Sequence, residues 1–304
     1  LPTKGGERRL QLALVTRSHQ KLNEQDIPKA RLLRLIEQGE VDVVIGTHAL
    51  LQELVRFKRI AVTIIDEQHR FGVDQRKILH EKSSSAAVPH FLSMTATPIP
   101  RSLALTLYGD LDVSVIKQLP SNRKKIITTL VTPEHKQKQY DFVLEQLQLG
   151  HQVYVVCPLI DPSDRMGAAS VTEEAARLMS IFTGYEIGVL HGKLKAEDKD
   201  AAMQSFVEGK TDVLVATTVV EVGVDVPRAT VMLIEGAERF GLAQLHQLRG
   251  RVGRSSKPSY CLLVASDDAG PTMRLHVLEE TNDGFAVAEA DLRMRGEGNL
   301  MGLQ

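Results

Sequence analysis

The chain has 304 residues, of which 43% are hydrophobic, and its 37 lysines and arginines nearly balance its 38 aspartates and glutamates. At about 100–200 residues per domain, this length predicts roughly two domains, each large enough to bury a core. The formal net charge of −1 gives no general argument for nucleic-acid binding, so any basic surface must be local. Cys157 and Cys261 are too few for a disulfide framework or a zinc site, which favours a reduced, cytosolic compartment. No apolar run approaches the roughly 18–20 residues that span a bilayer.

Short apolar runs alternate with helix-like segments along the first half of the chain, which predicts an α/β fold. A helix is expected over 28–38, because proline suits a first helical turn and Gly39 follows the end. The strands expected in this half are 10–15, 41–45, 62–66 and 90–94. Around 118–125 the periodicity stops in a stretch with proline, serine and clustered charge, which predicts a linker.

The second half has the pattern of a complete α/β lobe, with helices expected over 134–148 and 196–206. The strands expected here are 126–131, 152–157, 187–190, 212–216, 230–234 and 260–265. We therefore predict two parallel-sheet lobes, at 1–117 and 126–265, joined by the linker 118–125. Residues 266–304 add two helical stretches and an end rich in glycine and arginine.

Two adjacent carboxylates, Asp66 and Glu67, follow the apolar run 60–65. In a parallel sheet such a strand end faces the ligand crevice, where one carboxylate can hold Mg²⁺ on a nucleotide and the other can act as base toward water. In isolation, such a pair is more often a helix N-cap beside a solvated acid. Here a Gln-His pair follows the acids and can hydrogen-bond to a Thr-Ala-Thr turn, which would then sense the γ-phosphate. These further residues are Gln68, His69, Thr95, Ala96 and Thr97.

A segment rich in glycine and arginine, 247–254, can supply positive charge to a phosphoryl group. Arg251 and Arg254 are three residues apart, so on a helical turn they would project to one side. An arginine presented across a lobe interface stabilises the charge of phosphoryl transfer, and Gln247 is expected to support this coupling to ATP. The alternative is an arginine cluster in ordinary surface salt bridges. Glycines at 250 and 253 permit a close backbone approach that a plain surface helix would not require.

Segments after three of the expected strands carry the hydroxyls, glycines and backbone N–H groups that bind phosphodiesters without reading bases. Threonine after a strand is common, so each segment alone is a weak signal. The expected DNA contacts are Gly46, Thr47, His48, His191, Thr217 and Thr218. His191 is not expected to bind a metal ion, because no second ligand stands at metal spacing. Gly223 and Asp225 are assigned to ATP coupling, with Asp225 at the nucleotide ribose or at an interlobe partner.

The phosphate-binding loop of a nucleotide-hydrolysing lobe, G-x-x-x-x-G-K-[ST] between a strand and a helix, is not found in the printed sequence. Gly209, Lys210 and Thr211 are a poor candidate, because Gln204 stands where the first glycine belongs and a strand follows them. They are better explained as a helix-to-strand turn. We therefore expect the chain to begin after the phosphate loop, with part of the first lobe absent.

Taken together, these strings resemble the motor part of the RecG family, bacterial ATP-dependent DNA helicases of superfamily 2. The resemblance covers essentially the whole chain from about residue 10. The matching stretches are 45–50, 64–73, 94–105, 215–227, 241–251 and 291–296. The closest rival is the Mfd family of transcription–repair coupling translocases, which shares most of these strings. Gln68 and the stretch 282–285 favour RecG.

The resemblance implies two RecA-like lobes, the first truncated, and a C-terminal helical hairpin. It also implies use of ATP with Mg²⁺ and translocation on double-stranded, branched DNA, with fork reversal and Holliday-junction processing in recombination and repair. A monomeric, nucleoid-associated protein and a single-stranded DNA-binding protein as partner are implied as well. Arg295, in the last matching stretch, is the residue implied to couple closure of the two lobes to movement along the duplex.

The chain also departs from the family pattern. Arg17 and Ser18 stand where a glycine-containing turn is usual, so the family's contacts at this turn are not carried over to this chain. The DNA-binding wedge and the phosphate loop of the family both precede what is present, so the piece alone is expected to be inactive. A fragment that binds DNA or protein without hydrolysing ATP is the alternative from another functional class.

Overall fold

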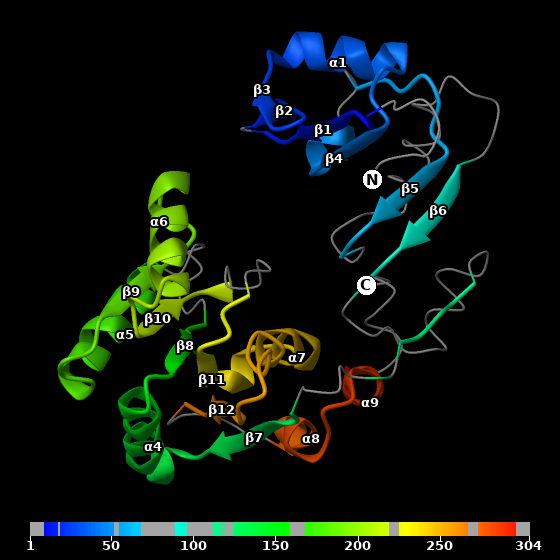
Figure 1. Ribbon diagram of the computed structural model, residues 1–304. Helices are drawn as coiled ribbons and strands as arrows, with labels where there is room; N and C mark the ends of the chain where they lie inside the picture. Colours follow the sequence, from blue (N-terminus) through cyan, green and yellow to red (C-terminus); the bar gives the residue numbers. More distant parts are fainter. Residues whose placement is uncertain are drawn as a thin grey trace. The chain divides into compact units, whose positions relative to one another are not determined.

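The computed structural model of the chain (Figure 1) describes residues 9–17, 19–51, 55–67, 89–95, 112–116, 118, 124–158, 168–218, 225–266 and 273–295. The chain forms two compact units, Leu1–Ala96 and Thr97–Gln304. This division comes earlier in the chain than the expected linker at 118–125, and the finer domain boundaries stay a prediction.

The first unit contains a four-stranded sheet with the order β3-β2-β1-β4. Its elements are β1 (Leu12–Val15), β2 (Gln20–Leu22), β3 (Gln25–Asp26), α1 (Lys29–Gln38) and β4 (Val43–Gly46). β1 and β4 run parallel, and α1 lies between them in sequence as the crossover helix. Leu32 and Ile36, one turn apart on α1, are buried in one cluster with Ala13 and Val15, so the helix packs on this sheet.

β5 (Val62–Ile65) and β6 (His90–Ser93) pair in parallel as a separate two-stranded sheet. The register aligns Ile65 with Ser93, and the Met94 N–H donates to the Ile65 carbonyl at 2.8 Å. The residues that follow β5 and β6 therefore leave the two strands at the same end.

The second unit is built on a six-stranded sheet with the order β7-β12-β11-β8-β10-β9, in which every pair is parallel. Its strands are β7 (Ile126–Val131), β8 (Gln152–Val156), β9 (Ile187–Leu190), β10 (Val213–Ala216), β11 (Ala229–Glu235) and β12 (Ser259–Val264). β8, β10 and β11 are buried along almost their whole length, which explains why their sequences are nearly continuous apolar runs. Because all six strands are parallel, the loops that follow them meet at one edge of the sheet.

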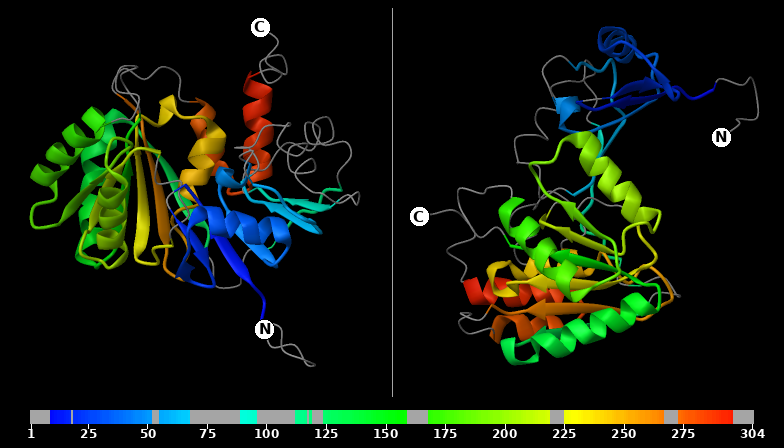
Figure 2. Two further views of the ribbon diagram at one scale, coloured as in Figure 1. Left: turned by 90° about the horizontal axis from the view of Figure 1, so that it is seen from above. Right: turned by 90° about the vertical axis from the view of Figure 1, so that its left-hand side faces the viewer.

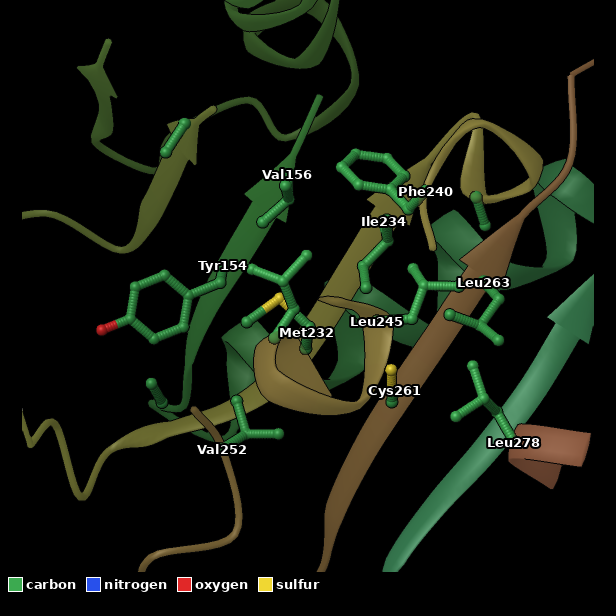
Figure 3. Packing of buried hydrophobic residues seen from close by; sticks show 14 of the residues in the cluster. Tyr154, Val156, Met232, Ile234, Phe240, Leu245, Val252, Cys261, Leu263 and Leu278 are labelled. Carbon is green, nitrogen blue, oxygen red and sulfur yellow. The ribbon is translucent and has the colours of Figure 1, made fainter. Parts of the chain in front are cut away.

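Helices cover both faces of this sheet (Figure 2). The helices are α4 (Lys136–Gln148), α5 (Ala168–Ile181), α6 (Ala196–Val207) and α7 (Leu242–Arg249). Val143 of α4 and Leu178 of α5 are fully buried in the cluster on one face. Phe206 of α6 and Leu245 of α7 are fully buried in the cluster on the other face (Figure 3). The unit is therefore a three-layer α/β/α sandwich.

The C-terminal helices α8 (His276–Glu280) and α9 (Gly284–Arg295) belong to this unit, and α8 lies beside the edge strand β7. Glu279 Oε1 accepts the Leu130 N–H at 2.6 Å, and Asn282 Nδ2 donates to the Ile126 carbonyl at 3.2 Å. These side chains satisfy backbone groups that an edge strand would otherwise leave unpaired. Of the two helical stretches expected near the C-terminus, α8 therefore docks on the sheet, while α9 packs against α7 and α8.

All the strands expected from the sequence are present, within one or two residues at most of their ends. The expected helix over 28–38 is α1, and Gly39 closes it with a φ of 75°. The hairpin of β2 and β3 was not predicted. Along the part of the chain that the structure describes, no helix is both long and apolar enough to span a bilayer.

Candidate nucleotide and nucleic-acid sites

Asp66 and Glu67 directly follow β5. Asp66 is exposed and Glu67 is half-buried, and the Glu67 N–H donates to Asp66 Oδ1 at 2.9 Å. Glu67 has a φ of 53°, in the left-handed region that costs a non-glycine residue about 1–3 kcal/mol. Such strain persists only where the surrounding structure enforces it, and it is concentrated at functional sites. The strain marks Glu67 as a candidate functional residue, and the exposed side chain of Asp66 lies beside it at the end of β5.

Thr95 is the second residue after β6, so it lies at the same end of the two-stranded sheet as Asp66. The other residues expected at this site, Gln68, His69, Ala96 and Thr97, lie outside the described residues. Within the described residues, no group of three or more His, Cys, Asp or Glu side chains could hold a metal ion alone. A nucleotide-bound Mg²⁺ needs only one or two carboxylates from the protein, and Asp66 fits that requirement.

Gly46 ends β4, and Thr47 and His48 follow it. A Cβ at Gly46 would clash with the Val15 carbonyl oxygen of β1, so the close packing of the two strands requires glycine. The Thr47 carbonyl accepts the Leu50 N–H at 3.0 Å and so stabilises the next turn. Gly46 and Thr47 therefore have structural roles, and their contacts with phosphate stay a prediction. The His48 side chain lies outside the described part of the structure.

Arg254 pairs with Asp225 in the second unit, with 3.8 Å between Nη1 and Oδ1 and with side chains 28% and 58% exposed. A pair this exposed contributes about 0–1 kcal/mol, so stability alone does not explain it. Tyr154 of β8 lies close by. Burial raises the pKa of Tyr154 to about 12, while the charges of Arg254 and Arg251 lower it and that of Asp225 raises it. The structure therefore brings Arg251, Arg254 and Asp225 near one buried tyrosine.

The expectation that Arg251 and Arg254 share a helical turn is wrong, because α7 ends at Arg249. Beyond α7 the chain leaves the helical path, since Gly253 adopts a φ of 74°. A Cβ at Gly253 would lie 2.8 Å from Ile126 Cγ1, which confirms the close approach expected at that glycine. A loop fixed by backbone geometry, not a helical repeat, positions the two arginines.

Arg249, which the sequence analysis did not single out, is only 2% exposed. Its guanidinium donates to the carbonyls of Leu278 and Thr281 at 2.7 and 2.9 Å, and to Thr128 Oγ1 at 3.3 Å. Burial lowers the pKa of Arg249. This side chain ties the end of α7 to the end of α8 and to β7, next to the loop that carries Arg251.

His246 also contacts Arg249, which donates to its Nδ1 at 2.8 Å. Burial, and then the charge of Arg249, lower the pKa of His246 to about 4, so the imidazole is neutral and can accept this bond. Leu242 and Leu245 of α7 are fully buried and stand seven and four residues before Arg249. Helical periodicity therefore places Arg249 on the buried face, and this is the signal that could have identified it.

The candidate DNA contacts of the second unit gather at the edge where its parallel strands end. His191 follows β9, and Thr217 and Thr218 follow β10. The Thr217 N–H donates to the Leu190 carbonyl at 3.2 Å, so the loop after β10 begins beside the last residue of β9. Thr217 is 2% exposed, whereas His191 and Thr218 are half-buried.

Three further residues were expected to couple ATP hydrolysis to movement. Gln247 lies half-buried on α7. Arg295 is the last residue of α9, and its side chain lies outside the described residues. Gly223 also lies outside them.

Two protein-family models match the chain. The DEAD/DEAH box helicase model matches residues 7–106, and the helicase conserved C-terminal domain model matches residues 135–256. The ATP-dependent DNA helicase RecG of Synechocystis sp. is 51% identical over 269 residues, which are 88% of this chain and 32% of that protein. RecG of Aquifex aeolicus is 49% identical over 90% of this chain and 35% of its own length.

A solved structure of RecG bound to a three-way DNA junction superposes on the chain with a TM-score of 0.72 at 43% identity, covering 97% of this chain and 37% of that one. The chain thus spans about a third of the length of the relatives it matches. Its two α/β units, the second on an all-parallel sheet and the first with an added antiparallel hairpin, correspond to the RecA-like helicase fold, and the resemblance to RecG is confirmed. By sequence and by fold, this chain is a relative of the RecG helicases.

Proposed function

We propose that the chain is part of the motor of an ATP-dependent translocase that acts on double-stranded, branched DNA. The observation that carries this proposal is the similarity to RecG, with 51% identity to one relative and a common fold with a RecG structure that holds a three-way DNA junction. Fork reversal and Holliday-junction processing, in recombination and repair, are the reactions that such a motor would drive.

Mg-ATP, when bound, supplies the phosphoryl group that is transferred to water. Asp66 is the residue proposed to hold the magnesium ion, because its exposed carboxylate follows β5 at the same end of the sheet where Thr95 follows β6. Glu67 is proposed to orient or deprotonate the attacking water. Arg251 and Arg254 are proposed to stabilise the negative charge that builds on the phosphate.

The DNA contacts are proposed to be sequence-independent, because threonine hydroxyls, backbone N–H groups and a histidine can bind phosphates without reading bases. His191 and Thr218 are proposed to supply them in the second unit, beside Thr217, which is 2% exposed and whose N–H is already bonded to Leu190, and Gly46 to His48 are proposed to supply them in the first. Arg295 is proposed to couple hydrolysis to movement along the duplex. We further propose a monomeric, cytoplasmic, nucleoid-associated protein that meets a single-stranded DNA-binding protein on branched DNA.

A chimera tests this function. This chain would replace the matching segment of the Synechocystis RecG helicase, and ATP hydrolysis would be measured with and without a three-way DNA junction. The proposal expects hydrolysis that the junction stimulates and that Glu67→Gln lowers by about 10²-fold or more without loss of DNA binding. A folded chimera that binds the junction but does not hydrolyse ATP would instead support a binding fragment.

A further inference from the structure

The short segment from the end of β11 to α7, residues 235–241, exposes one arginine on a loop that is otherwise buried or half-buried. Gly236 turns the chain with a φ of 57°, and a single 3-10 turn, Ala237–Arg239, follows it. Ala237 is fully buried and Phe240 is 4% exposed, and its ring lies in the core cluster (Figure 3). The Arg239 side chain, by contrast, is 39% exposed.

The start of this loop is held by the helices of one face. The Tyr140 hydroxyl donates to Glu235 Oε1 at 2.7 Å, and Lys136 Nζ lies 3.1 Å from Glu235 Oε2. The guanidinium of Arg177 on α5 donates to the Tyr140 oxygen at 2.5 Å, and it stacks 4.9 Å from the centre of the Tyr140 ring. Glu235 therefore keeps the end of β11, and the turn after it, in one position.

The middle of the loop is held by side chains and backbone groups from the chain beyond β12. Ser266, just beyond β12, donates its N–H to Glu238 Oε2 at 3.2 Å and its hydroxyl to Glu238 Oε1 at 2.5 Å. Arg274 donates to the carbonyls of Glu238 and Phe240, the latter at 2.9 Å. Arg239 therefore projects from a backbone with little freedom, so little backbone conformational entropy would be lost when the side chain binds a ligand.

The loop lies at the carboxyl ends of the parallel strands, where the candidate DNA contacts also lie. A Cβ at Gly236 would lie 3.0 Å from Pro158 Cγ, in the loop after β8, and 3.6 Å from Arg239 Cδ. The stem of Arg239 thus lies close to Gly236, just beyond the end of β11, and Gly236 in turn lies against the loop after β8. β8 is the neighbour of β10, whose following loop carries Thr217.

The ion pair of Arg239 leaves the guanidinium available to a ligand. Its Nε lies 3.6 Å from Glu238 Oε1, beyond ordinary hydrogen-bond distance. Both oxygens of that carboxylate already accept shorter bonds from Ser266. Glu238 therefore serves to fix the loop more than to neutralise Arg239.

We propose that Arg239 binds a backbone phosphate of the DNA and extends the track of contacts from the ends of β9 and β10 to the end of β11. The proposal rests on the DNA-binding function proposed above. A guanidinium offers a planar fork of donors that matches phosphate oxygens, and such contacts position DNA without specifying its sequence.

The test compares Arg239→Ala with a matched control, Arg228→Ala, in this chain. Arg228 is also exposed, but it immediately precedes β11, at the opposite edge of the sheet. Both variants lose one positive charge. Dissociation constants would be measured by fluorescence anisotropy on branched DNA duplexes of two unrelated sequences, over a series of salt concentrations.

Arg239→Ala should bind about tenfold more weakly than the parent chain at low salt, and equally so on both sequences. The slope of log K against log salt concentration should fall by about 0.9, the loss of one phosphate contact on duplex DNA. Arg228→Ala should differ little from the parent in affinity and in slope. If Arg239→Ala lowers the melting temperature, Arg239→Gln, which keeps the stem over Gly236, replaces it as the deciding variant.

The outcomes separate the two proposals. If the parent chain binds no DNA, the proposed DNA contacts of this chain fail, and the role of Arg239 fails with them. If the parent binds DNA but the Arg239 and Arg228 variants behave alike, only the assignment of Arg239 is overturned.

Discussion

Replacing Arg249 with alanine should destabilise the second unit, because the guanidinium satisfies one buried and one partly buried carbonyl group. The carbonyls of Leu278 and Thr281 accept from it at 2.7 and 2.9 Å. A buried acceptor left without its donor costs about 1–3 kcal/mol. Part of this cost is offset because a charge no longer has to be buried. We expect a net loss of about 2–4 kcal/mol in the free energy of unfolding, and a fall in Tm of about 5–15 °C for a unit of this size.

Thermal unfolding followed by circular dichroism would measure this loss. Arg254→Ala is the control, since its ion pair is long and exposed, and its Tm should stay close to that of the parent chain. The Tm of Arg249→Lys should lie between those of Arg249→Ala and Arg254→Ala, because one ammonium group cannot reach all the acceptors of the guanidinium. Equal melting temperatures for Arg249→Ala and Arg254→Ala would refute the structural role of Arg249.

Further predictions concern catalysis, coupling and pH. In the RecG chimera, Glu67→Gln should lower ATP turnover by about 10²-fold or more while nucleotide binding persists. Turnover at the parent rate would contradict the role of Glu67 toward the attacking water. At least one of Arg251→Ala and Arg254→Ala should lower turnover by about 10³-fold with DNA binding retained, and unchanged turnover in both would make them surface residues. Arg295→Ala should keep DNA-stimulated hydrolysis and lose unwinding, and an equal fall in both activities would contradict a coupling role. The pKa of His246 falls on folding from 6.5 to about 4, so its contribution to stability is present above pH 6.5 and is lost as the pH falls toward 4. His246→Gln should therefore reduce the loss of stability between pH 7 and pH 5 in urea titrations, and an unchanged pH dependence would contradict the depressed pKa.

Much of the fold could be predicted because its central strands are buried on both faces. β8 and β11 are buried almost throughout, so their sequences are uninterrupted apolar runs with clear ends. The hairpin of β2 and β3 lacks such a signal. Its strands are short and polar, and its turn places Asn23 and Glu24 at positive φ, where glycine is the residue that a sequence analysis looks for.

The candidate sites were predictable only in part, for a related reason. The residue types at a strand end, such as Asp66 and Glu67, can be recognised along the chain. The path of the backbone after α7 cannot, because it depends on Gly253 packing against Ile126, a contact between distant residues. Arg249 was missed because a charged residue is rarely fully buried, although its helical register placed it there.

Unwinding of a three-way DNA junction by the RecG chimera tests the central claim most directly. A strand-displacement assay with labelled DNA, run with and without ATP, would measure it. Our account predicts ATP-dependent unwinding by the chimera and none by its Glu67→Gln variant. A correctly folded chimera that hydrolyses ATP but leaves the junction intact would contradict the claim that this chain is part of a branched-DNA motor.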